Sequence, residues 1–368
     1  MFSQDAKNHI AACRICFMCR HLCPIGLATG KEAHTPRGRA ILAQYSDGSN
    51  QGAEIFKESV IDFYQCALCN ACADWCETSY EPAKFIREAR REAVAQNVLP
   101  EKVAPVVDQV LSTGSLFAEK EDIAASADGL PKTADVLLVL GDTARAKTPQ
   151  IAKAVVSLLK KAGVDFTLLR DEPPVGAMMY DLIGETAEVQ ATANTFAQAV
   201  AETNCKHVVV LDPADAKILL ADYPRWDCTL SAEVHTATAY VAQLLKENKL
   251  VITKKAADQK VCYHDPCRLV RDLDETEPAR EIIAAMGAEM HEIFLNKTNT
   301  RCCGGECVAA HSPEITKMTA NARLVQAKDT GAETMLCACP GCYDIFSAGR
   351  TENSIEIEDI FVLLDRCC

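Results

Sequence analysis

The sequence lacks the features of a secreted, membrane-spanning or nucleic-acid-binding protein. Its opening residues, MFSQDAKNHI, contain neither the basic segment nor the apolar run of a signal peptide. The longest strongly apolar runs, VLLVL at 136–140 and HVVVL at 207–211, are far too short to span a bilayer. Lys+Arg number 38 against 51 Asp+Glu, and the formal charge of −13 disfavours contact with phosphate backbones and anionic lipid. We therefore expect a cytoplasmic chain without its own anchor, which reaches a membrane only through partners.

A dinucleotide-binding motif is also missing. No G-x-G-x-x-G follows a predicted strand, and Cys303-Gly304-Gly305-Glu306 does not have that spacing. Flavin or nicotinamide chemistry is therefore expected to belong to a partner protein.

Cysteine, in contrast, is abundant, with 20 residues in a chain of 368. A chain long enough for two or three domains with sufficient cores does not need that many disulfides, so the thiols are expected to be reduced metal ligands. Two groups near the start share one pattern, in which three cysteines recur every third residue and a fourth follows after four. This spacing is typical of ferredoxin [4Fe-4S] clusters, whereas zinc sites usually pair two C-x2-C hooks. The groups are Cys13, Cys16, Cys19 and Cys23, and Cys66, Cys69, Cys72 and Cys76.

The fourth cysteine of each group is expected to serve the other cluster, by analogy with two-cluster ferredoxins. One cluster then has Cys13, Cys16, Cys19 and Cys76, and the other has Cys66, Cys69, Cys72 and Cys23. Two zinc sites remain the alternative. Pro24 follows Cys23 as in bacterial ferredoxins, but Glu77 follows Cys76, so the second motif is less standard.

Helices are predicted around these motifs. The spacer 27–63 is expected to hold two helices and contains Thr35-Pro36-Arg37-Gly38-Arg39; Arg37 and Arg39 either bond cluster sulfurs or carboxylates, or begin a solvated helix. An amphipathic helix is predicted over 84–97, before Pro100. Residues 101–131 read as a helical linker.

Strands and helices alternate in the rest of the chain, which predicts parallel sheets. Strands are expected at 134–140, 164–169, 206–211, 260–264, 289–294 and 333–337, and helices at 149–162, 190–203, 277–286 and 313–328. KKAGVDFTLL around Gly163 matches AAMGAEMHEI around Gly287, and VVVLDPADAKI around Pro213 matches MLCACPGCYDI around Pro340. This internal repeat predicts two duplicated α/β domains. The expected boundaries are 1–100 for a helical ferredoxin-like domain, 101–131 for the linker, and 132–250 and 251–368 for the duplicates.

The second duplicate carries Cys267-x34-Cys302-Cys303-x35-Cys339-x2-Cys342. The segments His264-Asp265-Pro266-Cys267, Cys302-Cys303-Gly304-Gly305 and Cys339-Pro340-Gly341-Cys342 resemble the cysteine-rich CCG domain. That domain occurs in the B and D subunits of heterodisulfide reductase, the glycolate oxidase iron–sulfur subunit and lactate-utilisation iron–sulfur proteins. The segment 35–39 between two ferredoxin motifs is similar to the glycolate oxidase and heterodisulfide reductase D type. The resemblance covers nearly the whole chain.

The resemblance implies a fold, cofactors and partners. It implies a helical two-cluster ferredoxin-like module followed by two Rossmann-like CCG domains, an α+β and α/β architecture. It implies that Cys267, Cys302, Cys303, Cys339 and Cys342 hold a third, noncubane [4Fe-4S] cluster, with zinc as the alternative. It also implies a flavoprotein partner of the FAD-dependent 2-hydroxyacid dehydrogenase type, and a further electron-transfer subunit is possible.

The first duplicate departs from the motif. Asp142 stands at the first cysteine position, Pro174 and Val175 replace the double cysteine, and Asp212 and Asp215 replace the last two cysteines. These groups cannot hold a soft iron–sulfur centre. The three carboxylates are expected to cap helices in solvent; a small polar pocket or a hard-cation site are the alternatives.

Only one of the two duplicates carries the CCG cysteines, and this limits the functions that the chain can have. Heterodisulfide cleavage, as the resemblance implies, uses two noncubane clusters, so we expect an electron-transfer subunit rather than the reductase itself. The first alternative is a catalytic subunit that reduces a disulfide or a quinone directly at the CCG centre. The second alternative has no redox function: a scaffold protein whose cysteines bind structural zinc.

Several residues are left with open roles. Cys205, Cys228, Cys262, Cys307 and Cys337 are expected to be core residues, with Cys307 and Cys337 also near the CCG centre. Cys367 and Cys368 are expected to be exposed, reactive or frayed. His264 is expected to be packed, and Arg268 and Arg271 to bind an anionic substrate or offset cluster charge.

Overall fold

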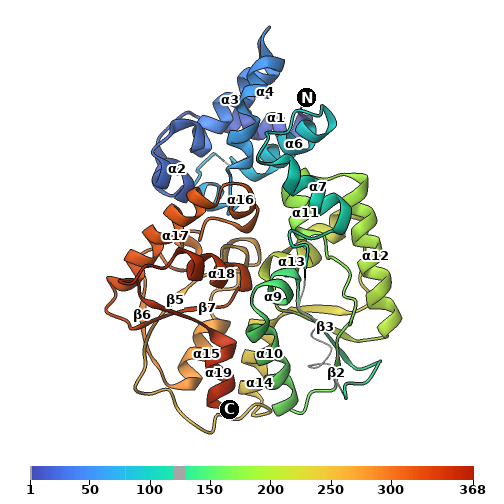
Figure 1. The fold of residues 1–368 in the computed structure, drawn as a ribbon, viewed down its shortest axis with the longest axis vertical. Helices are drawn as coiled ribbons and strands as arrows, with labels where there is room; N and C mark the ends of the chain where they lie inside the picture. The colour runs from blue at the N-terminus through green and yellow to red at the C-terminus, as the bar shows by residue number, and fades with distance from the viewer. Residues whose placement is uncertain (1, 79, 120–128) are drawn as a thin grey trace.

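The computed structural model describes residues 2–78, 80–119 and 129–368. Its N-terminal part is helical and forms a cap over the rest of the molecule (Figure 1). The cap and the helix that follows it contain α1 (Gln4–Ala12), η1 (Met18–His21), α2 (Pro24–Thr29), η2 (Glu32–His34), α3 (Pro36–Gly48), α4 (Gly52–Tyr64), α5 (Ala71–Asp74), α6 (Pro82–Ala95) and α7 (Ala104–Thr113). Helix α7 lies in the predicted linker, of which 120–128 fall outside the described residues.

Helix α6 shows how sequence and packing agree in the cap. It begins at Pro82, whose fixed φ suits a first helical position, and it buries the predicted apolar face. Arg87 and Arg90 are buried with that face, Arg90 completely. The apolar pattern alone gave no sign that these two arginines are interior residues.

The remainder consists of two parallel four-stranded sheets with the same strand order. The first is β2-β1-β3-β4 and the second β6-β5-β7-β8. Their strands are β1 (Val136–Val139), β2 (Phe166–Thr167), β3 (His207–Val210), β4 (Glu233–Thr236), β5 (Lys260–His264), β6 (Glu289–Glu292), β7 (Thr334–Cys337) and β8 (Glu356–Asp359). The repeated order confirms the predicted α+β and α/β fold with a duplicated Rossmann-like unit. The two outer strands β4 and β8 were not predicted, because their sequences, EVHT and EIED, lack an apolar run.

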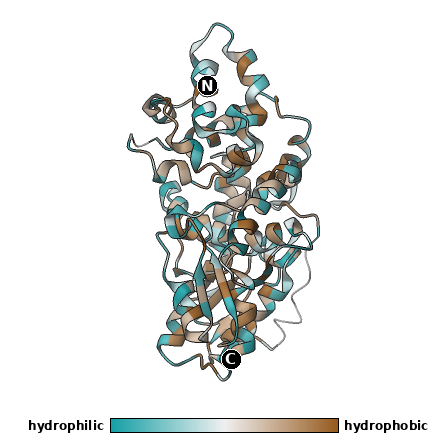
Figure 2. Ribbon diagram, turned by 90° about the vertical axis from the view of Figure 1, so that its left-hand side faces the viewer, coloured by the Kyte–Doolittle hydropathy of each residue, from teal (hydrophilic) through white to brown (hydrophobic). Residues whose placement is uncertain are grey.

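Helices cover both sheets and join them through one core. In the first unit they are α9 (Asp142–Ala146), α10 (Pro149–Lys161), α11 (Ala177–Ile183), α12 (Ala187–Thr203), α13 (Pro213–Lys217) and α14 (Ala237–Lys246). In the second they are α15 (Pro278–Met286), α16 (Glu306–His311), α17 (Pro313–Lys328), α18 (Pro340–Gly349) and α19 (Ile360–Cys367), with short η5 (Arg268–Asp272) and η6 (Lys297–Asn299). Helices α10 and α14 pack on α19 and α15, so apolar residues of both units form a single cluster. Figure 2 shows that apolar and polar residues alternate along the helices of the molecule.

The arrangement places the strand ends beneath the cap. In a parallel sheet, ligands bind beyond the carboxyl ends of the strands. Cys267 follows β5 and Cys339 follows β7, and the loops that carry them meet the cap, where α2 packs on α17 and α6 on α11. In the described part of the chain, no helix combines the length and the apolar character needed to cross a membrane.

Candidate cofactor sites

All twenty cysteines lie in the described part of the chain, and none of them forms a disulfide. The thiols are therefore available as ligands. Fourteen of them line three pockets that follow one another from the cap to the second sheet.

The first pocket lies in the cap and is lined by Cys13, Cys16, Cys19 and Cys76, and also by Cys72. The first four are the group that the predicted exchange of fourth cysteines names, and their assignment to one cluster stays a prediction. Cys16 is exposed, whereas Cys19 is buried. Burial raises the pKa of the Cys19 thiol to about 12, so a thiolate there needs a bound cation.

The second pocket is lined by Cys66, Cys69, Cys72 and Cys23, the four cysteines that the prediction assigns to the second cluster. Cys23 is the N-cap of α2, and its sulfur accepts from the Gly26 N–H at 3.3 Å. Leu68 N–H lies 3.4 Å from the Cys66 sulfur. Burial raises the pKa of Cys23 to about 11. Four converging sulfurs with backbone N–H donors fit an iron–sulfur cluster, whose thiolates accept such bonds.

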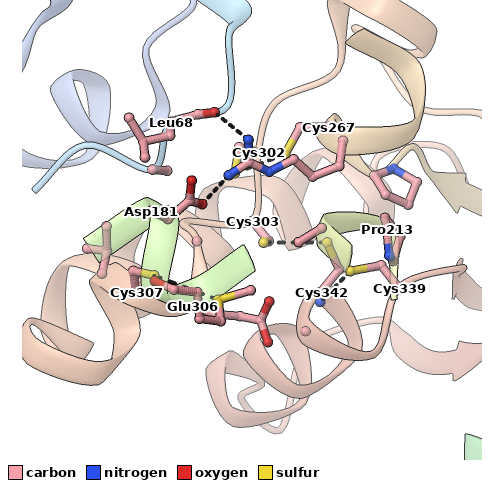
Figure 3. Close-up of a pocket in the computed structure, with 18 of the residues that line it drawn as sticks. Leu68, Asp181, Pro213, Cys267, Cys302, Cys303, Glu306, Cys307, Cys339 and Cys342 are labelled. Carbon is pink, nitrogen blue, oxygen red and sulfur yellow. Dashed lines mark hydrogen bonds and ion pairs between the residues drawn. The ribbon is translucent and has the colours of Figure 1, made fainter. Parts of the chain in front are cut away.

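The third pocket contains all five cysteines of the CCG motif, contributed by three segments (Figure 3). The Cys267 and Cys302 sulfurs are 3.9 Å apart, and those of Cys303 and Cys342 are 3.5 Å apart. The Gly304 N–H lies 3.4 Å from the Cys302 sulfur, and the Cys342 N–H lies 3.3 Å from that of Cys339. The adjacent pair Cys302 and Cys303 thus faces two different partners, which suits a centre with more than one metal.

Gly305 brings the cap loop against this third pocket. Its φ of +84° is a backbone conformation that favours glycine. A Cβ added there would lie 3.0 Å from the Cβ of Ala67. Ala67 belongs to the cap loop that carries Cys66 and Cys69. The glycine therefore allows the second cluster loop to touch the CCG loop.

Side chains of η5 fix the same contact. Arg268 Nη1 donates to the Leu68 carbonyl at 3.2 Å, and Arg271 Nε donates to the Cys69 carbonyl at 2.6 Å. Asn70 Nδ2 donates to Asp272 at 2.6 Å. Cys66 lines both the second and the third pocket. We call residues 66–70 together with 268–272 the cluster seam.

A buried carboxylate from the first unit completes the seam. Asp181 on α11 pairs with Arg268 and, at 2.8 Å, with Arg87 of α6. Burial alone raises the pKa of this carboxyl, but the two guanidinium groups outweigh it and lower the value to about 2. Arg268 and Arg271 therefore join the second sheet unit to the cap. Both roles expected for them, substrate binding and offset of cluster charge, stay predictions. Sequence reasoning missed Asp181, which no motif marks.

The first unit has a small acidic pocket where its counterpart has cysteines. Asp142, Asp212 and Asp215 line it together with Glu172. Asp212 caps α13 through the Ala214 N–H at 2.7 Å, but it is buried, so the expected solvated carboxylates are wrong for this residue. Glu172 closes the pocket by accepting from the Leu140 and Gly141 N–H groups, at 2.9 and 2.8 Å. Burial and the neighbouring carboxylates raise the pKa of Asp215 well above its usual value.

Two further expectations need correction. Arg37 and Arg39 do not begin a solvated helix. Arg37 pairs with the Glu32 carboxylate, which confirms the other expectation for this residue, and the buried Arg39 donates to the carbonyls of His34, Asp62 and Gln65 at 2.6 to 2.8 Å. Cys367 is neither exposed nor frayed, because α19 buries it.

Other expectations are confirmed. Cys205, Cys228, Cys262, Cys307 and Cys337 are all buried. Of the two that were expected near the CCG cysteines, Cys307 lines their pocket, and its sulfur lies 3.7 Å from that of Met178. His264 is fully buried and packs edge-on against Phe346, with ring centroids 4.7 Å apart.

Comparison with known proteins agrees with these pockets. Residues 12–81 match a 4Fe-4S dicluster domain, and residues 261–346 match the CCG cysteine-rich domain. The chain is therefore similar to a dicluster ferredoxin domain in its N-terminal part and to a CCG domain in its second sheet unit. It is 27% identical over 403 residues to the D subunit of the dihydromethanophenazine:CoB–CoM heterodisulfide reductase of Methanosarcina acetivorans, covering 98% of this chain and 96% of the relative.

Two other matches extend the comparison. A probable membrane-anchored ferredoxin of Chromohalobacter salexigens is 27% identical over 342 residues, which are 86% of this chain and 48% of that protein. The crystal structure of a hypothetical protein from Helicobacter pylori superposes with a TM-score of 0.64 at 10% identity, covering 100% of this chain and 73% of the other. The latter match shows the fold alone.

Proposed function

We propose that the chain is an electron-transfer subunit of a multi-subunit oxidoreductase. Electrons pass between a flavoprotein partner and another acceptor or donor through two [4Fe-4S] cubanes and the CCG centre. The observation that carries this proposal is that the second and third pockets share a lining residue: Cys66 lines the pockets of both the second cubane and the CCG centre. The hydrogen bonds of the cluster seam hold those two pockets together.

The proposed ligands follow the pockets. Cys13, Cys16, Cys19 and Cys76 hold the first cubane, and Cys66, Cys69, Cys72 and Cys23 hold the second. Cys267, Cys302, Cys303, Cys339 and Cys342 hold a noncubane [4Fe-4S] centre. When bound, the clusters supply one-electron chemistry; the protein fixes their order and surrounds their sulfurs with backbone N–H groups, which tune the potentials. The domain boundaries 1–100, 101–131, 132–250 and 251–368 belong to the same proposal.

The flavoprotein is proposed to dock at the first cubane. Cys16 is exposed there, and Ile15, Phe17, Met18 and Trp75 are 52%, 57%, 54% and 40% exposed beside it. An apolar rim around the most accessible cluster suits a transient contact between redox partners. The other end of the route lies at the CCG centre. Free thiols in such number favour the cytoplasm, a reducing compartment, as the site of action.

The ligand exchange between the two cubanes is the sharpest test of this assignment. Cys23→Ser is expected to change the EPR spectrum of the cluster held by Cys66, Cys69 and Cys72, and to leave the other cubane intact. Cys76→Ser is expected to do the opposite. Cys228→Ser is the matched control, because Cys228 is buried and lies in none of the three pockets. The proteins are purified anaerobically, and iron, sulfide and zinc are counted with the spectra.

Stoichiometric zinc and almost no acid-labile sulfide, even after reconstitution, would overturn the iron–sulfur assignment. If Cys23→Ser instead altered only the cluster of its own motif, the exchange would be wrong, but the electron-transfer role would survive.

Direct reduction at the CCG centre is the second candidate. The pocket of that centre is also lined by Met178, Pro213 and Ala214 of the first unit, so a substrate could reach the cysteines between the two units. Turnover of a disulfide or a quinone by the isolated chain, with an artificial electron donor, would favour this reading over the relay.

A further inference from the structure

Three side chains of types that can ligate a metal meet on the first sheet, and none of them lines the three cysteine pockets. His207 begins β3, and Glu233 and His235 lie on the neighbouring strand β4. His207 pairs with Glu233, and Val209 pairs with His235, in the parallel register of these strands. Since residues two apart share a face of a strand, His207, Glu233 and His235 lie on one face of the sheet.

Their donor atoms form a small triangle. His207 Nδ1 lies 3.1 Å from His235 Nε2, and Glu233 Oε2 lies 3.6 Å from the first nitrogen and 3.7 Å from the second. Tetrahedral Zn²⁺, with ligand distances of about 2.0–2.1 Å, keeps its ligand atoms roughly 3.4 Å apart. The three atoms thus already stand near the spacing that one zinc ion would impose.

Burial and charge suit a cation at this place. The side chains of His207 and His235 are 38% and 27% exposed, so both rings are held in position while one side stays open to solvent. The Glu233 carboxylate, 69% exposed, supplies the negative charge.

We propose that His207, Glu233 and His235 form a binding site for a divalent transition metal, with Zn²⁺ as the ion that fits best. Two imidazoles and one carboxylate occupy three positions, and water completes the fourth, as in other His/His/carboxylate sites. The bound ion joins the outer strand β4 to β3. This site is independent of the iron–sulfur assignment, because it uses no cysteine.

The second unit supplies a matched control. Strand β6 carries the same Glu-x-His spacing, and His291 Nε2 lies 3.0 Å from Glu289. The strand beside it, β5, offers Cys262 and no histidine opposite this pair. His291→Gln therefore removes an equally exposed strand histidine that lacks a second imidazole.

The test uses the full-length, cluster-loaded chain dialysed anaerobically against buffered free Zn²⁺. Zinc and iron are counted by mass spectrometry, and the zinc shell is read by X-ray absorption. The wild type and His291→Gln are expected to bind one zinc per chain with nitrogen and oxygen ligands only. His207→Gln and His235→Gln are expected to bind it at least about 100-fold more weakly, a loss beyond that of an outer-shell partner, with iron unchanged.

Three results would overturn the site. They are no zinc uptake by the wild type, equal uptake by the histidine variants, or a sulfur-containing zinc shell. The first two would mean that the 3.1 Å contact is a hydrogen bond between two imidazoles and nothing more. The third would assign the zinc to cysteines. The iron count in each variant shows whether the chain has folded and loaded its clusters, so a misfolded variant is recognised as such.

Discussion

Single buried arginines hold the ends of backbone segments in the cap. Arg90 is fully buried, and its guanidinium donates to the carbonyls of Phe63, Tyr64, Cys66 and Asp181. The bond to Cys66 is 2.6 Å long, so one side chain fixes the entry to the second cluster loop. Because a buried carbonyl without a partner costs about 1–3 kcal/mol, this arginine matters more than any surface ion pair.

Arg90→Met keeps much of the side-chain volume and removes these donors. We expect a loss of at least about 3 kcal/mol in the free energy of unfolding, and a lower iron content from the second cubane. Arg91→Met is the control, since the Arg91 side chain is 40% exposed and, among the described residues, forms an ion pair with Glu88 at 3.9 Å. Thermal unfolding and iron analysis measure both effects. Equal stability of the two variants would contradict the role given to Arg90.

Asp359 predicts a pH dependence of stability. It caps α19 through the Phe361 N–H at 2.9 Å, and burial raises the pKa of its carboxyl to about 8. In the unfolded chain the carboxyl has its usual pKa near 4. The folded state thus binds the proton more tightly, and the free energy of unfolding falls as pH rises from about 4 to 8.

Asp359→Asn keeps the cap and cannot ionise. Its melting temperature is therefore expected to fall less between pH 6 and pH 8.5 than that of the wild type. Even a tenfold difference in proton affinity, about 1.4 kcal/mol, corresponds to roughly 2–4 °C in a chain of this kind. Parallel pH profiles of the two proteins would refute the assignment.

At the scale of elements, the loops that follow the strands determine how closely the second and third cysteine pockets approach each other. Gly305 can be compared with Gly331, which also has a positive φ, +77°, but has open space where a Cβ would be. Alanine at either position strains the backbone by about 1–2 kcal/mol. Only Gly305→Ala also presses on Ala67 in the cluster seam.

Gly305→Ala is therefore expected to change the EPR signals of the second cubane and of the CCG centre, whereas Gly331→Ala only lowers the melting temperature. Spectra of both variants at equal iron content measure this. Identical spectra would show that the two cluster loops do not depend on their contact.

The elements also show what the sequence could and could not reveal. Fixed cysteine spacing predicted both cubane groups, and the sequence pattern predicted β1, β2, β3, β5, β6 and β7. Strands β4 and β8, each at one edge of its sheet, are polar and take their structure from β3 and β7, so they were missed. Asp181, Glu172 and Glu306 were missed for the same reason: their partners, Arg87, Gly141 and Thr143, are distant in sequence.

At the scale of the whole molecule, the cap carries the proposed docking face and the sheets carry the far end of the route. Phe17→Ser removes an exposed apolar ring beside Cys16. We expect roughly tenfold weaker binding to the flavoprotein that co-purifies with the wild type, since truncating a central aromatic costs about 1–2 kcal/mol or more. Phe294→Ser is the control, because Phe294 is 71% exposed and lies outside the three cysteine pockets. Equal losses for both variants would remove the docking face from the first cubane.

The cluster seam has a consequence for how the protein matures. The residues that join the cap to the second sheet, Arg268 and Arg271, grip the same loop that presents Cys66 and Cys69. Cys66, Cys69 and Cys72 are only partly exposed, and the two arginines cover their loop from the side of the second sheet. We therefore expect cofactor insertion to be faster before the cap docks on the second sheet than after it. A cap produced separately would keep the first cysteine pocket intact, whereas the cysteines of its second pocket would be exposed to oxygen.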